Sequence, residues 1–140
     1  MDLKIKKLNS EAKLPTKHHE SDAGLDFYCV EEVVVKSGEQ AVVKTGFSIE
    51  VPFGYTGLIW DKSGISIKHG IKTLGGVIDS GYRGEILIGV INHSKEDYIF
   101  EKGNKIAQML IQKIEDVNIK EVEELSVADR GEKGFGSTGK

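Results

Sequence analysis

The sequence is poor in cysteine and proline and has no long hydrophobic run. Its single cysteine, Cys29, cannot form an internal disulfide, so we expect a protein of a reducing compartment such as the cytoplasm. No stretch approaches the ~20 apolar residues of a membrane-spanning helix, and the polar start of the chain predicts no signal peptide. The 2 prolines stand against 17 glycines, which indicates many turns between short elements.

The chain also lacks an excess of either charge. Its net charge is −3 at pH 7, which argues against a protein that binds nucleic acid or anionic membranes in general. A local cationic pocket for a small anion is still compatible with this balance. With 140 residues, of which 39% are hydrophobic, the chain is long enough for one domain with a substantial core. We predict a single domain over residues 1–140, with a folded core in 1–128 and a flexible tail in 129–140.

Apolar and polar residues alternate with a period of two in several short segments, which is typical of half-buried strands. A short helical turn is expected where Ser63 can cap the start and Gly70 can end it. Many short strands and almost no helix predict an all-β fold, a jelly-roll-like β-barrel. The predicted strands include the N-terminus around Leu3–Ile5 and the segments Val33–Val35, Gln40–Val51, Tyr55–Trp60, Ile86–Ile91 and Val117–Leu125.

The segment 86–91 is apolar on both faces apart from Gly89. A strand of that kind is buried on both sides, so we expect one of its faces to lie in a core between subunits.

The stretch Gly75–Glu85 is the most unusual part of the chain. Glycines surround an apolar pair, Val77 and Ile78, which runs into Asp79, Tyr82 and Arg83. We interpret it as a β-hairpin, with 86–88 as the return strand, whose rim carries an acid, a ring and a cation. Its glycine amides would be open to a flat ligand. The alternative is an ordinary hairpin with a capping aspartate and a core tyrosine.

Three other features stand out. Asp26 lies where a loop enters a strand, and Gln108 interrupts an apolar run. The alternative for Asp26 is an ordinary acid at the edge of a strand, and the alternative for Gln108 is a residue on a solvated face. The tail from Arg130 holds four glycines around Phe135, so it cannot pack a core, but it could close over a nucleotide. The alternative is a disordered tail. The adjacent pair His18–His19 lacks the spacing of zinc ligands.

Five stretches, in order, resemble the five motifs of the trimeric dUTPase family. The tail is the most specific of them, because it matches the family pattern R-G-x-x-G-F-G-S-T-G at every fixed position. Because all five stretches occur in the same order as the family motifs, we do not attribute the match to coincidence. The matching segments are 23–26, 62–64, 76–84, 103–108 and 130–139.

The chain departs from the family pattern at several positions. Lys62 and Lys105 replace arginines, which keeps the charge but loses the bidentate guanidinium fork. Asn104 replaces an acid and Gly81 replaces an aspartate. The glycine at position 81 also resembles the corresponding motif of a related family, the dCTP deaminases. A deaminase would need a catalytic glutamate at the position that we align with Gly89, and it would not be expected to end in this tail. A deaminase and a catalytically silent nucleotide-binding barrel are therefore the alternatives.

The resemblance implies hydrolysis of dUTP to dUMP and pyrophosphate, which limits uracil in DNA and supplies dUMP for dTMP synthesis. It implies that Asp79 activates the water that attacks the α-phosphorus and that Tyr82 lies against the deoxyribose, where it excludes a 2′-hydroxyl. Mg²⁺ would be held mainly by the triphosphate and water, with Asp26 acting on the water shell.

The resemblance also implies the substrate contacts and the assembly. The partner would be dUTP, bound by a homotrimer in which one chain supplies Ser63 and Gln108, a second supplies Asp79 and Tyr82, and the third its tail. Phe135 would stack on the uracil. The other implied contacts are Gly75, Gly76, Val77, Ile78 and Thr73 on the uracil side, Lys62, Gly64 and Lys105 on the phosphate side, and Arg130, Gly136, Ser137 and Thr138 from the tail.

Overall fold

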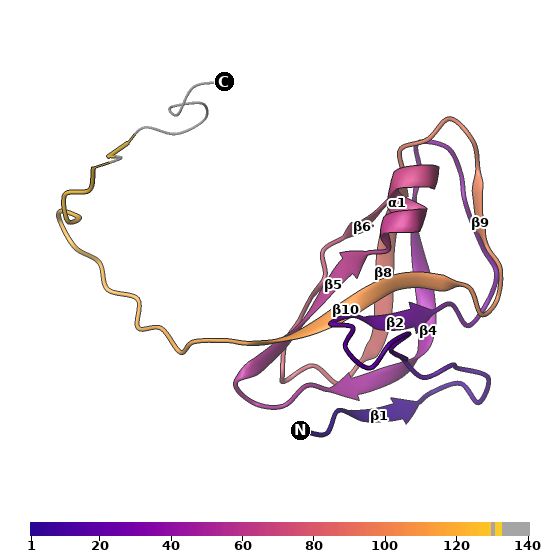
Figure 1. The fold of residues 1–140 in the computed structure, drawn as a ribbon, viewed down its shortest axis with the longest axis horizontal. Coiled ribbons are helices and arrows are strands. Elements are labelled where there is room, and N and C mark those ends of the chain that lie inside the picture. Colours follow the sequence, from indigo (N-terminus) through magenta and orange to yellow (C-terminus); the bar gives the residue numbers. More distant parts are fainter. Residues whose placement is uncertain (130, 133–140) are drawn as a thin grey trace.

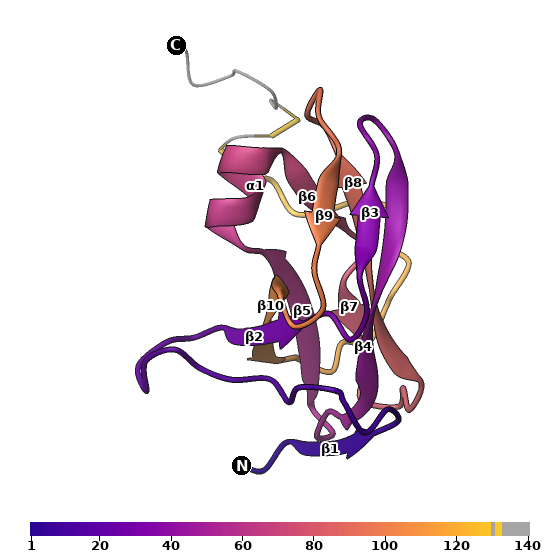
Figure 2. The ribbon, with the colours of Figure 1, turned by 90° about the vertical axis from the view of Figure 1, so that its right-hand side faces the viewer.

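Two four-stranded antiparallel sheets and a two-stranded one make up the folded part of the molecule (Figures 1 and 2). The computed structural model describes residues 1–129, 131 and 132. The first sheet has the order β1-β4-β8-β6, the second β2-β10-β5-β7, and the third pairs β3 with β9. The strands are β1 (Lys4–Lys7), β2 (Leu25–Tyr28), β3 (Val33–Val35), β4 (Gln40–Glu50), β5 (Tyr55–Asp61), β6 (Ile71–Leu74), β7 (Val77–Ile78), β8 (Glu85–Asn92), β9 (Tyr98–Phe100) and β10 (Lys105–Lys113).

The hydrophobic core lies between the two larger sheets. Phe27 of β2 and Phe47 of β4 are fully buried and meet edge to face, with ring centroids 5.3 Å apart. Because side chains alternate along a strand, Ile86 and Ile88 of β8 enter this core while Leu87 between them is exposed. The all-β class is confirmed, although the sheets of the described residues do not close into a barrel.

The single helix of the described residues, α1 (Ser63–His69), connects β5 to β6. Its predicted end is confirmed, because Gly70 adopts the left-handed conformation (φ 67°) and donates its N–H to the Ser66 carbonyl. The prediction that Ser63 caps the start is wrong. The cap position is held by Lys62, and no side chain caps the helix.

The prediction of a β-hairpin over Gly75–Glu85 is also wrong. β7 pairs with β5, through Gly57–Ile78 and Leu58–Val77, whereas β8 pairs with β4 and β6. The glycine-rich stretch therefore crosses from one sheet to the other. The prediction missed this because an apolar pair followed by a turn signal does not reveal which earlier strand takes up its hydrogen bonds.

Within the single chain, only one face of β8 is buried, since Leu87 is 48% exposed. The two-sided burial expected for 86–91 is thus absent from the single chain, and a core between subunits stays a prediction.

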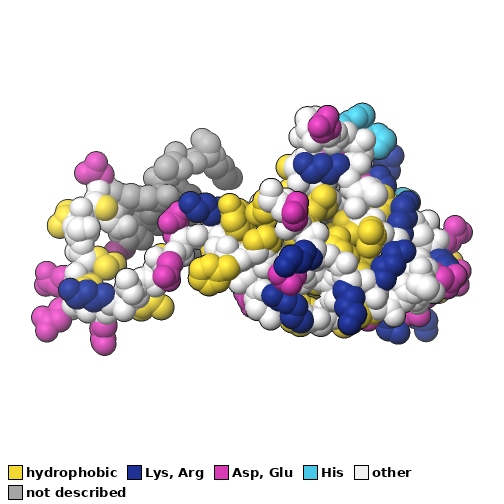
Figure 3. Space-filling view, turned by 90° about the horizontal axis from the view of Figure 1, so that it is seen from below, with side chains coloured by type: hydrophobic (Ala, Val, Ile, Leu, Met, Phe, Trp, Pro, Cys, Tyr) yellow, Lys and Arg dark blue, Asp and Glu magenta, His cyan; other side chains and the backbone are white. Residues whose placement is uncertain are grey.

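After Lys113 the described chain leaves the sheets as an extended arm, residues 114–129 (Figure 1). The strand predicted for Val117–Leu125 is wrong, because no other described segment lies beside it to take its backbone hydrogen bonds. Ile119 and Leu125 are almost fully exposed. Acidic side chains line the arm, whereas basic ones gather on the folded part (Figure 3). A core boundary at residue 128 stays a prediction.

None of the helices among the described residues is long and apolar enough to cross a membrane.

Candidate functional site

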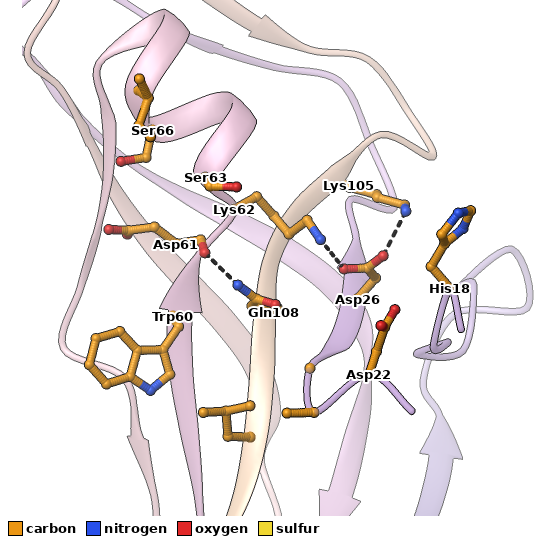
Figure 4. A pocket seen from close by; sticks show the side chains of 14 residues that line it. His18, Asp22, Asp26, Trp60, Asp61, Lys62, Ser63, Ser66, Lys105 and Gln108 are labelled. Carbon is orange, nitrogen blue, oxygen red and sulfur yellow. Dashed lines mark hydrogen bonds and ion pairs between the residues drawn. The ribbon is translucent and has the colours of Figure 1, made fainter. Parts of the chain in front are cut away.

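A cavity of about 800 Å³ lies where β2, β5, β10 and the start of α1 meet (Figure 4). It is larger than the two other cavities of the site, which are described below. Asp26, Asp61, Lys62, Ser63, Lys105 and Gln108 line it, together with residues of the loop before β2. Three of the five motif segments therefore converge on one space. We call it the phosphate-side cavity, after the role expected of these residues.

Asp26 holds two lysines at the edge of the phosphate-side cavity. Its side chain is 4% exposed, and its two carboxylate oxygens lie 2.6 Å from the Lys62 and Lys105 ammonium groups. Burial alone would raise the pKa of Asp26, but the hydrogen bonds and charges of the two lysines outweigh burial and lower it. The same contact raises the pKa of Lys105. One carboxylate thus orients two cations, and this cluster of three groups has one more positive than negative charge.

Gln108 occupies a defined position in the same cavity. Its amide Nε2 donates to the main-chain carbonyl of Asp61 at 2.9 Å, and the two strands β10 and β5 are paired at this level. A Cβ at Gly24 would clash with the Gln108 amide oxygen, so a larger residue there would force the Gln108 side chain to move. The glycine of the first motif therefore leaves space for the Gln108 amide in this position.

Asp61 and Thr73 form a second polar connection, which the sequence reasoning missed. The Asp61 carboxylate accepts the Thr73 backbone N–H at 2.8 Å and its hydroxyl at 2.7 Å, and it pairs with Lys72 at 2.9 Å. Thr73 is buried. The signal that could have revealed Asp61 was an acid at the end of an apolar strand, directly before the second motif.

Asp79 and Tyr82 lie elsewhere, around a cavity of about 160 Å³ that shares no residue with the phosphate-side cavity. Both side chains are exposed, Tyr82 to 43%. The Tyr82 hydroxyl donates to the Glu85 carbonyl at 2.9 Å, and its N–H donates to the Asp79 carbonyl. A side chain at Gly84 would clash with the Tyr82 ring. The turn therefore fixes the ring beside Asp79.

A third cavity, of about 230 Å³, contains Gly75, Gly76 and Thr73. Both glycines have positive φ, 68° and 111°, and Ile59 donates its N–H to the Gly76 carbonyl at 2.8 Å. Trp60, the one tryptophan of the sequence, borders both this cavity and the phosphate-side cavity and is 53% exposed. The sequence pattern around Trp60 does not indicate a role for it.

The structure thus divides the predicted site residues into groups. The residues expected on the phosphate side all line the phosphate-side cavity, except Gly64, which is exposed and borders none of the cavities described. Val77 and Ile78 border the Asp79 cavity, and Val77 also borders the third one. The expected tail contacts, Arg130, Phe135, Gly136, Ser137 and Thr138, lie outside the described residues.

The described residues include no cluster of three or more histidine, cysteine, aspartate or glutamate side chains that could hold a metal ion. The phosphate-side cavity offers lysines, a hydroxyl and an amide, which are groups that bind phosphate oxygens.

Gly89 stands where a deaminase would need a glutamate, and it is closely packed. On β8 it pairs with Leu74 of β6, and a Cβ at Gly89 would stand 3.3 Å from the Leu74 Cβ. This observation disfavours the deaminase alternative.

Comparison with known proteins agrees with this geometry. A family model described as dUTPase matches residues 10–139. The deoxyuridine 5'-triphosphate nucleotidohydrolase of Clostridioides difficile is 49% identical over 140 residues, which cover 99% of this chain and 98% of the relative.

Solved structures give the same answer. A mutant Staphylococcus bacteriophage 80alpha dUTPase with dUpNHpp has a TM-score of 0.92 at 35% identity, covering 99% of this chain and 98% of that one. A mutant dUTPase from phage phi11 of S. aureus, described with a coordinated structural Mg(II) ion, has a TM-score of 0.83 at 31% identity, covering 89% and 98%. The predicted resemblance is confirmed, and the chain belongs to the dUTPase family.

Proposed function

We propose that this protein hydrolyses dUTP to dUMP and pyrophosphate in the cytoplasm. The observation that carries the proposal is the lysine pair on Asp26, which shares a cavity with Ser63 and Gln108. Two ammonium groups, a hydroxyl and an amide suit the oxygens of a triphosphate, with lysine acting as a point charge. The relatives, which are nucleotidohydrolases of deoxyuridine triphosphate, support the same substrate.

In this scheme Asp79 is the general base. Its carboxylate is exposed at a turn beside Tyr82, so it can reach a water molecule without breaking an ion pair among the described residues. It takes a proton from the water as the water attacks the α-phosphorus, and pyrophosphate leaves. The Tyr82 ring packs on the deoxyribose and excludes a 2′-hydroxyl.

The uracil is read by backbone groups of the Gly75–Ile78 segment. Donors and acceptors fixed in the order that uracil requires would be left unpaired by cytosine, which is how a polar site rejects a close analogue. Phe135 of the tail stacks on the base, while Arg130, Gly136, Ser137 and Thr138 close over the phosphates.

Mg²⁺ completes the scheme. When bound with the triphosphate, the metal would supply neutralisation of the phosphate charge. Asp26 is the residue that would act on the water shell of the metal.

We also propose a homotrimer with shared sites. The exposed Leu87 and the one-sided burial of β8 leave an apolar face for another subunit, and Asp79 lies in a different cavity from Gln108. One chain would supply the phosphate side and a neighbouring chain Asp79 and Tyr82, with the third chain giving its tail.

A single assay tests the proposal. Purified protein is incubated with dUTP and Mg²⁺, and pyrophosphate, ammonia and bound nucleotide are measured. Release of pyrophosphate with dUMP is the expected result. Release of ammonia would indicate a deaminase instead, and binding without turnover a silent nucleotide-binding barrel.

A further inference from the structure

Asp61 is a largely buried acid for which the proposed scheme has no role. Its side chain is 22% exposed and lies at the end of β5, directly before Lys62. Burial alone would raise the pKa of Asp61, but the hydrogen bonds from Thr73 and the Lys72 charge outweigh burial and lower it. The carboxylate is therefore charged at neutral pH and carries three partner groups.

The bond from Asp61 to Thr73 joins the two larger sheets. β5 belongs to the sheet of β2 and β10, whereas Thr73 lies on β6, at the edge of the other sheet. The chain between these two residues contains α1 and the phosphate-side residues Lys62 and Ser63. The contact thus closes the loop that carries part of the phosphate-side cavity.

Asp61 also contacts β10, the strand that pairs with β5. Its main-chain carbonyl accepts the Gln108 amide at 2.9 Å, as the dashed line in Figure 4 shows. One residue therefore contacts Gln108 through its backbone and Thr73 through its side chain.

The segment that follows Thr73 needs such an anchor. Gly75 and Gly76 have the largest backbone freedom of any residue type, so ordering them is costly in entropy. The Ile59 N–H to Gly76 carbonyl bond restrains the end of this segment, and Asp61 restrains its beginning at Thr73. Both restraints come from β5.

We propose that Asp61 is a positioning residue, which holds Gln108 and the Thr73–Gly76 segment in a fixed relation and thereby sets the affinity for the nucleotide. The inference rests on the proposed function, which places the phosphates at Gln108 and the uracil at Gly75 and Gly76. Asp61 itself touches no substrate. In the proposed trimer each Asp61 would support the phosphate side of one site and the base side of the next.

The test compares Asp61→Ala, Asp61→Asn and Thr73→Val with a matched control, Asp97→Ala. Asp97 also accepts a backbone N–H, from Ser37 at 2.9 Å, but it lies outside the three cavities of the site. Affinity is measured with a non-hydrolysable imido analogue of dUTP by the fluorescence of Trp60, and KM and kcat with dUTP. Thermal unfolding checks that each variant folds.

Asp61→Ala is expected to weaken analogue binding and raise KM about tenfold, while kcat at saturation stays near that of the unaltered chain. Asp61→Asn retains an oxygen for the Thr73 N–H and should recover most of the affinity. Thr73→Val should have an intermediate effect, and Asp97→Ala none. The double variant Asp61→Ala with Thr73→Val should bind no more weakly than Asp61→Ala alone, because Asp61→Ala already removes the bond to the Thr73 hydroxyl.

Unchanged affinity and KM in a folded Asp61→Ala protein would overturn the inference. So would a loss of kcat and thermal stability with KM unchanged, which is what a purely structural acid would produce.

The unaltered chain is assayed alongside. If it binds the analogue but releases no pyrophosphate, the proposed function fails while the positioning of the nucleotide is still tested by binding. If Asp61→Asn behaves like Asp61→Ala, the hydrogen-bond explanation is wrong.

Discussion

The two halves of the candidate site are built in opposite ways. On the phosphate side, Asp26 is buried and both its oxygens are held by lysines. Around Asp79 the side chains are exposed, and no described group bonds to the Asp79 carboxylate. The first arrangement fixes charges in advance of binding, while the second leaves a base free to act on water. The comparison suggests that binding and chemistry are separable, and the following predictions test that separation.

The largest effect is expected from Asp79→Asn. Removing a general base typically costs ~10²–10⁴-fold in turnover, whereas the fold and the phosphate side should be unaffected because Asp79 is exposed. We expect kcat to fall by that amount and the affinity for the imido analogue to stay the same. Near-normal turnover would remove Asp79 from the mechanism, and a large loss of affinity would break the separation.

Asp26→Asn is expected to act mainly on stability. It leaves Lys62 and Lys105 with their charges and no counter-charge, and because both lysines are partly exposed we expect a loss of roughly 1–3 kcal/mol. The measurement is urea unfolding. Glu50→Gln is the matched control, since it removes exposed pairs with Lys4 and Arg83 and should change little. Equal losses of stability in the two variants would show that the burial of Asp26 does not strengthen the contribution of its ion pairs.

Tyr82 should control the choice of sugar. Tyr82→Ala opens the space that the ring fills, so we expect the ratio of activity on UTP to activity on dUTP to rise about tenfold or more. Tyr82→Phe keeps the ring and loses only the bond to the Glu85 carbonyl, and its ratio should be unchanged. The two ratios, measured as kcat/KM, distinguish a steric role from one of the hydroxyl.

The smallest effect concerns pH. Because the pKa of Asp26 is lowered in the folded protein, its contribution to stability is present above the unfolded pKa of about 4 and is lost as pH falls through the folded value. Urea midpoints should therefore decrease below about pH 4. In Asp26→Asn the decrease should be shallower. A slope identical to that of the unaltered chain would show that Asp26 is not a source of the acid sensitivity.

Much of this molecule could be predicted from local pattern. The strands at 33–35, 40–51 and 55–60 and the helix end at Gly70 follow from alternation and turn chemistry, and the motifs indicated the family. Pairing could not be predicted in the same way, because nothing local reveals that β7 joins β5 rather than β8.

The candidate site shows the same limit. Asp61 and Trp60 stand next to a motif, but their roles depend on what folds against them. The arm failed as a predicted strand because a strand needs a neighbour, which the described single chain does not offer at 117–125.

Subunit complementation tests the shared site most directly. One variant carries Asp79→Asn, and the other combines Lys62→Ala with Gln108→Ala. Each is assayed alone, after mixing of the folded proteins, and after joint unfolding and refolding. In a cyclic trimer with shared sites, every mixed assembly contains one site with both an intact phosphate side and an intact Asp79. We expect activity to return only in the refolded mixture. If it stays as inactive as the separate variants although mixed trimers form, both halves come from the same chain and the shared site is wrong.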